Sequence, residues 1–137
     1  MHIPNKPRKY GIKVMLLADA RNQFAYNGYI YAGKDTDGVG LPVSVKKNSK
    51  PSQSVIRLAK PIYGTNRNIT TDNWFSSVEL VILLKPNGLT YVGTMRKSKR
   101  DIPPKFLANR EREVRSTVYG FTKDMTLERY CIQIVFT

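Results

Sequence analysis

The stretch from residue 68 to residue 94 constrains the fold most, because it reads as a strand, a helix and a second strand in quick succession. A β-type run over 68–71 ends at Asp72. Residues 76–79 match a capping box, and Pro-Asn-Gly at 86–88 ends the helix before a second β-type run. This order predicts a right-handed crossover between two parallel strands.

The N-terminal part of the chain predicts a β-hairpin. Residues 10–18 are apolar and β-rich, and a polar turn over 19–22 follows them. Residues 24–31 then carry aromatic side chains at alternate positions, which is typical of a second strand, and Gly28 marks a possible bulge.

The remaining chain completes a mixed α/β pattern. A polar linker is expected over 46–51, followed by a helix over 52–59 that Ser52 or Ser54 caps. The helix over 78–84 is apolar nearly all round and should be buried on more than one side. Two late β-type runs lie at 118–121 and 127–136. We expect one mixed sheet with a hairpin first and a parallel crossover later.

The charge and composition of the chain favour some classes of function and exclude others. The 137 residues include 23 Lys and Arg against 10 Asp and Glu, a net charge of +13, which favours nucleic acid as the partner. A single cysteine, Cys131, and a single histidine, His2, exclude an internal disulfide, a Cys-based zinc cluster and Ser-His-Asp catalysis. No apolar run is long enough to cross a bilayer, so we expect no membrane partner.

Two aspartates stand out by position. Asp19 follows the first predicted strand, and Asp72 lies between the third strand and its helix. Functional groups of open α/β sheets gather at such strand ends, and two carboxylates brought together there favour a divalent cation such as Mg²⁺. Each also has a plainer interpretation, because Asp19 is an ordinary turn residue and Asp72 could cap the following helix.

Aromatic and basic clusters have alternative interpretations too. Trp74 and Phe75 are expected to be core anchors rather than platforms for stacked bases. The basic run at 96–100 could be a solvated patch, a contact to the DNA backbone or a nuclear-import signal. The positive charge of the whole chain favours phosphate contact.

Three segments resemble one known family. Residues 3–13 (Ile-Pro-Asn-Lys-Pro-Arg-Lys-Tyr-Gly-Ile-Lys) resemble the opening of the catalytic core of piggyBac-type transposases. Residues 68–77 (Asn-Ile-Thr-Thr-Asp-Asn-Trp-Phe-Ser-Ser) resemble the second-aspartate motif of that family, and residues 93–103 resemble the stretch after its next strand. The matches follow the family's order and spacing.

The resemblance implies an RNase H-like (retroviral-integrase-like) core in which three aspartates bind Mg²⁺ or Mn²⁺. Asp19 and Asp72 would be the catalytic, metal-binding first and second. The family's third aspartate lies in a Gly-Gly-Val-Asp-type motif that no stretch of this chain matches. We therefore expect a truncated core over 1–95, followed over 96–137 by a basic segment and the start of a β-rich insertion.

The resemblance also implies a function. We expect part of a DNA transposase, ancestrally a metal-dependent enzyme of DNA strand cleavage and transfer, which is inactive alone because one aspartate is missing. The alternative is a non-catalytic DNA-binding module derived from a transposon. The partner would be double-stranded DNA of transposon ends, in the nucleus, with a full-length relative as a possible dimer partner. The residues expected to hold this DNA are Lys6, Arg8, Lys9, Arg96, Lys97, Lys99 and Arg100.

Overall fold

The computed structural model describes residues 11–33, 35–107, 113 and 115–130. The chain divides into two compact units, residues 1–95 and residues 96–137. The predicted DNA contacts at Lys6, Arg8 and Lys9 lie outside the described residues, as do Cys131 and the end of the last predicted strand.

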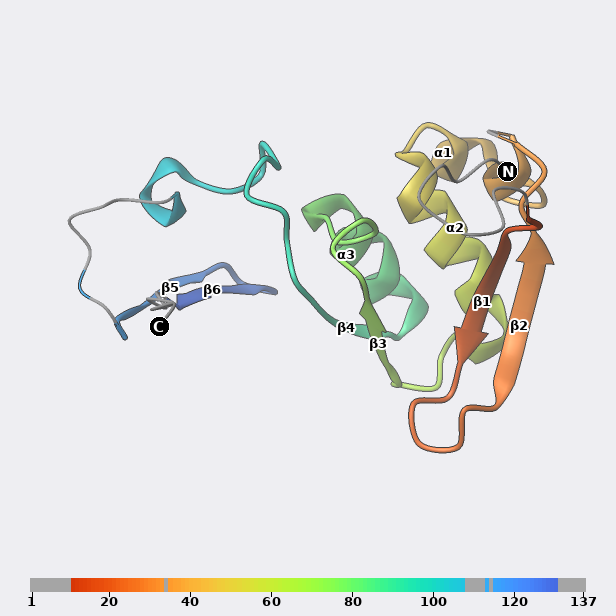
Figure 1. Cartoon of the computed structure of the whole chain (residues 1–137), viewed down its shortest axis with the longest axis horizontal. Coiled ribbons are helices and arrows are strands. Elements are labelled where there is room, and N and C mark those ends of the chain that lie inside the picture. The colour runs from red at the N-terminus through yellow and green to blue at the C-terminus, as the bar shows by residue number, and fades with distance from the viewer. Residues whose placement is uncertain (1–10, 34, 108–112, 114, 131–137) are drawn as a thin grey trace. The chain divides into compact units, whose positions relative to one another are not determined.

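The first unit begins with the predicted antiparallel hairpin, formed by β1 (Val14–Ala18) and β2 (Ala25–Ile30) (Figure 1). Its register is regular from the Val14–Ile30 pair to the Leu17–Asn27 pair and shifts between Leu17 and Ala18. The bulge predicted at Gly28 is wrong, because Gly28 pairs in register with Leu16. The irregularity lies next to the turn instead.

Short helices follow, and the polar linker expected over 46–51 is partly helical. They are the 3₁₀ turn η1 (Thr36–Gly38), α1 (Val43–Lys46), α2 (Lys50–Ala59) and the 3₁₀ turn η2 (Lys60–Ile62). The predicted helix over 52–59 is confirmed but starts two residues earlier, with Ser49 at the N-cap and a proline in its first turn. Ser52 and Ser54 are therefore not caps but buried helical residues.

The predicted parallel strands with a helix between them are confirmed, and the right-handed sense of the crossover stays a prediction. β3 (Asn68–Thr71) pairs in parallel with β4 (Thr90–Gly93), and α3 (Val78–Leu84) and the 3₁₀ turn η3 (Lys85–Asn87) connect them (Figure 1). The helix ends at Gly88, whose φ of 64° is in the left-handed region.

The start of α3 corrects the predicted capping box. Ser77 is the N-cap, and its side chain accepts the backbone N–H of Leu80 at 3.1 Å. Glu79 is then the second helical residue, one position too early to return a bond to the cap. It accepts instead from Ser49 and Ser52 of α2, so that it joins the starts of the two helices.

The core of the first unit lies between α2, α3 and the strands. Leu80 and Leu84 of α3 are fully buried, whereas Ile82 is 60% exposed. The prediction that this helix is buried on more than one side is wrong for the face that carries Ile82. The buried cluster consists of Leu41, Val55, Ile56, Ala59, Ile62, Ile69, Leu80, Leu84 and Leu89.

The second unit contains a 3₁₀ turn, η4 (Pro104–Phe106), and an antiparallel pair, β5 (Thr117–Phe121) and β6 (Thr126–Tyr130). The ring of Phe106 is buried against Gly120, where an added Cβ would come within 2.7 Å of it. The Arg129 guanidinium donates to the Phe106 carbonyl.

The α/β class is confirmed. The strands of the described residues form three separate two-stranded pairs in place of one continuous sheet. Within the same residues, no helix has both the length and the apolar character that a bilayer span requires.

Candidate functional site

Asp19 lies in the turn that follows β1 and holds this turn together. Its Oδ1 accepts the backbone N–H of Arg21 at 2.8 Å and that of Asn22 at 2.9 Å. The bonds from Asn22 and Arg21 lower the pKa of the Asp19 carboxyl below its usual value, and the charges of Arg67 and Arg21 add to the effect. Asp19 therefore has the geometry of a turn residue and is ionised at neutral pH.

Asp72 lies in an exposed turn between β3 and α3. Its Oδ1 accepts the backbone N–H of Asn73 at 2.6 Å, and its carbonyl accepts the N–H of Phe75 at 3.0 Å. The expectation that Asp72 caps the following helix is wrong, because Ser77 has that role. The Asp72 carboxylate stabilises the turn and does not cap the helix.

Asp19 lies near the start of β3. Arg67, the residue just before β3, acts electrostatically on Asp19. The Arg67 guanidinium also lies 5.1 Å from the ring centroid of Tyr26, which is next to the β1–β2 turn. The turn that carries Asp19 is therefore beside the beginning of β3, and Asp72 follows the end of β3.

The residues just after Asp72 approach the start of β1. Trp74, two residues after Asp72, lines a hollow together with Lys13 and Met15. Asp19 lies beyond the other end of β1, in the turn to β2. That the carboxylates of Asp19 and Asp72 meet at one site stays a prediction.

Metal binding by Asp19 and Asp72 depends on how close their carboxylates lie. Mg²⁺ takes oxygen ligands at close range, and two carboxylates can share it only when both lie at one site. The described residues contain no group of three or more His, Cys, Asp or Glu side chains that could hold a metal ion. A pair of carboxylates is smaller than such a group, so a Mg²⁺ or Mn²⁺ shared by Asp19 and Asp72 stays a prediction.

The basic run opens the second unit as a pair of turns. The N–H of Lys99 donates to the Arg96 carbonyl at 3.0 Å, and that of Ile102 donates to the Lys99 carbonyl at 3.2 Å. Arg96, Lys97 and Arg100 are exposed, and Lys99 is half-buried. We call Arg96, Lys97, Lys99 and Arg100 the basic turn. It presents positive charge to solvent.

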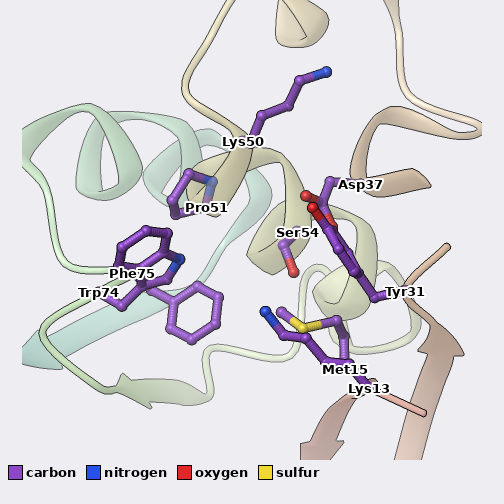
Figure 2. A pocket seen from close by; sticks show the side chains of 9 residues that line it. All are labelled: Lys13, Met15, Tyr31, Asp37, Lys50, Pro51, Ser54, Trp74 and Phe75. Carbon is purple, nitrogen blue, oxygen red and sulfur yellow. The ribbon is translucent and has the colours of Figure 1, made fainter. Parts of the chain in front are cut away.

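Sequence reasoning missed a small hollow in the first unit, which has a volume of about 80 Å³. Trp74 and Phe75 line one side, Tyr31 and Asp37 line the other, and the Lys13 amine points in between (Figure 2). Trp74 is 52% exposed, so its assignment as a core anchor is wrong. Phe75 is half-buried and packs against the core, as expected. The remaining lining residues are Met15, Lys50, Pro51 and Ser54.

Asp37 is buried behind this hollow. Its Oδ1 accepts the hydroxyl of Tyr29, which also lies 2.8 Å from Ser54 Oγ. Burial, and then the bond to the Asp37 carboxylate, raise the pKa of Tyr29 to about 12. The Arg57 guanidinium stacks on the Tyr29 ring at 3.9 Å. These contacts fix Asp37 in a polar network, a role that its place in a Gly-rich loop does not reveal.

Comparisons with known proteins agree with one another. A family model described as transposase IS4 matches residues 1–136. A cryo-EM structure of a piggyBac transposase synaptic complex with hairpin DNA matches with a TM-score of 0.81 and 39% sequence identity. The match covers 97% of this chain and 27% of the transposase chain. None of the curated proteins searched matches.

Proposed function

This chain belongs to the transposase IS4 family and is of the piggyBac type, and we propose that it holds double-stranded DNA by the phosphate backbone. The observation that carries the proposal is the exposed basic turn in a chain with a net charge of +13. The relative of known structure is itself a complex with hairpin DNA, which supports DNA as the partner.

We assign DNA strand cleavage and transfer to the longer transposase, since this chain spans only 27% of the solved relative. An RNase H-like core remains part of the proposal, supported by the parallel crossover from β3 to β4. A β-rich insertion after residue 95 is supported by the β5–β6 pair. A nuclear location and a dimer with a full-length relative remain predictions.

We infer that the chain alone binds DNA without cutting it. Of the three aspartates that the family resemblance implies, this sequence matches two, Asp19 and Asp72, and Asp19 already accepts two backbone N–H groups. Because one of the three carboxylates has no counterpart in this sequence, we propose binding rather than cleavage as the activity of the chain alone.

The proposed binding is electrostatic. Lysine and arginine side chains that neutralise phosphates release condensed counterions, so affinity falls with salt by a logarithmic slope of about −0.9 per phosphate. If each cation of the basic turn neutralises one phosphate, the turn contributes a slope of about −3 to −4. The two backbone bonds of the turn hold its main chain in place.

The test is fluorescence anisotropy of a labelled DNA duplex in EDTA at rising KCl concentration. We expect tight binding at low salt, and the triple variant Arg96→Ala, Lys97→Ala, Arg100→Ala should make the slope shallower by about 3. The control Lys123→Ala removes an exposed cation from the same unit and should change the slope by about 1 at most. An affinity that salt does not change, or a triple variant that binds like the wild type, would refute the proposal.

The same binding experiment also tests whether Asp19 and Asp72 take part in holding DNA. The double variant Asp19→Ala, Asp72→Ala should bind the duplex as tightly as the wild type or more tightly, because it removes negative charge without removing a phosphate contact. Loss of binding in this variant, with the fold intact by circular dichroism, would show that DNA binding depends on the two carboxylates.

A further inference from the structure

The hollow beside Trp74 is built from side chains that suit a nucleobase. The Trp74 indole is 52% exposed, although a tryptophan carries a large apolar surface that folding usually covers. It belongs to the rim of the hollow, with Tyr31 on the facing side (Figure 2). An exposed indole at the edge of a cavity is a surface on which a flat ring can stack.

Two of the residues that line the hollow, Lys13 and Lys50, are lysines, whose amines can bind a phosphate. The Lys13 amine is 4.8 Å from the Tyr31 ring centroid and points into the hollow (Figure 2). Lys50, at the upper rim, lies 3.6 Å from Asp35, and both side chains are solvent-exposed. An exposed pair of this kind is weak, so Lys50 can exchange its partner for a phosphate.

The buried carboxylate of Asp37 favours a neutral base over a free phosphate as the ligand of the hollow. Asp37 lines the hollow and is only 6% exposed. Its negative charge repels a free phosphate that enters the hollow, whereas it accepts the N–H groups of a neutral base. The chemistry therefore favours a base in the hollow and a phosphate at the rim.

The volume limits how the base can enter. A hollow of about 80 Å³ is too small to enclose a nucleotide, so most of the base has to remain on the solvent-exposed part of the indole. Bases inside a duplex are stacked on their neighbours and cannot reach this face. The ligand that fits is a nucleotide that is unpaired.

We propose that the hollow lined by Trp74, Tyr31 and Lys13 binds one unpaired nucleotide of single-stranded DNA, with the base stacked on Trp74. The inference rests on the proposed function, because the unpaired nucleotide belongs to DNA that the chain holds by the phosphate backbone. It places this site next to the turn of Asp72, in the first unit.

The chain itself carries the probe for this site. Trp74 is the only tryptophan of the 137 residues, so the intrinsic tryptophan emission reports on the hollow alone. A short single-stranded oligodeoxycytidylate should quench this emission, because a base stacked on the indole is in direct contact with it. An abasic oligonucleotide with the same number of phosphates should quench it far less.

Variants give an independent readout by anisotropy with the same labelled oligodeoxycytidylate. Trp74→Ala should weaken binding by roughly tenfold, the lower range for loss of one stacked base. Trp74→Phe keeps an aromatic face and should bind nearly as the wild type. Affinity for the duplex should not change in either variant, since the indole is exposed and neither substitution disturbs the core.

Two results would overturn the inference while the proposed function stands. One is equal quenching by the normal and abasic oligonucleotides when anisotropy shows both bound. The other is an oligodeoxycytidylate affinity that Trp74→Ala leaves unchanged. If neither the duplex nor any oligonucleotide binds at low salt, the proposed function itself fails.

Discussion

Glu79 joins the starts of α2 and α3, and its removal gives the sharpest test of the fold. Its Oε2 accepts the hydroxyl of Ser49 at 2.6 Å, the hydroxyl of Ser52 at 2.7 Å and the backbone N–H of Ser49 at 3.1 Å. Ser52 is fully buried, so its hydroxyl depends on partners inside the protein. We predict that Glu79→Ala destabilises the first unit.

The magnitude follows from these contacts. A hydrogen bond to a charged group contributes about 1.5–3 kcal/mol. Ser49 is exposed, so water can replace much of the hydrogen bonding that Ser49 loses when Glu79 is removed. The Ser52 hydroxyl still has two hydrogen-bond partners, Ser49 Oγ at 2.9 Å and Ser77 Oγ at 3.4 Å. We therefore expect Glu79→Ala to lower the free energy of unfolding by about 2–3 kcal/mol, and Glu79→Gln, which keeps one acceptor oxygen, by about 1 kcal/mol.

The assay is urea unfolding at neutral pH, followed by far-UV circular dichroism. Glu113→Ala is the matched control, because Glu113 is an exposed glutamate in the second unit, and its effect should stay within about 0.5 kcal/mol. A stability of Glu79→Ala within about 0.5 kcal/mol of the wild type would refute the role assigned to Glu79.

Three further predictions concern stability. Leu80→Ala should lower the free energy of unfolding by about 3 kcal/mol, because the Leu80 side chain is fully buried. Ile82→Ala should lower it far less, because the Ile82 side chain is 60% exposed. Equal effects of the two variants in urea unfolding would contradict the packing of α3. Gly88→Ala should lower the free energy of unfolding by about 1–2 kcal/mol, since the φ of Gly88 is 64° and the new Cβ would lie 3.1 Å from the Gly64 Cα. An unchanged urea midpoint would contradict the left-handed conformation of Gly88. Burial and the Asp37 bond raise the pKa of Tyr29 to about 12, so its neutral form contributes stability that is complete below pH 10 and is lost as the pH rises towards 12. The melting temperature should therefore fall more steeply above pH 10 in the wild type than in Tyr29→Phe, and parallel profiles would contradict this contribution.

Local patterns in the sequence predicted the elements well. The hairpin, the helix before Pro61 and the strand–helix–strand crossover each have apolar runs bounded by turn residues, and these signals act within a few positions. The start of α3 shows the limit of this approach. Ser76 and Ser77 are both good caps by composition, and only the backbone path from β3 determines that Ser77 has the role.

The candidate site was harder to predict, because it depends on contacts between distant parts of the chain. The sequence shows that Asp19 and Asp72 each follow a strand, but the relative direction of β1 and β3 decides whether their carboxylates meet. The exposure of Trp74 likewise depends on how the turn after β3 lies against α2. The hollow draws on residues from 13 to 75, and no local pattern links them.

The central claim is that this chain alone holds DNA without cutting it. The most direct measurement is a nicking assay, in which the protein is incubated with supercoiled plasmid in Mg²⁺ or Mn²⁺ at a salt concentration where anisotropy shows it bound. We expect the plasmid to be bound and to stay supercoiled. Nicking that disappears in both Asp19→Ala and Asp72→Ala would contradict the claim, because the chain alone would then cut DNA with these two carboxylates.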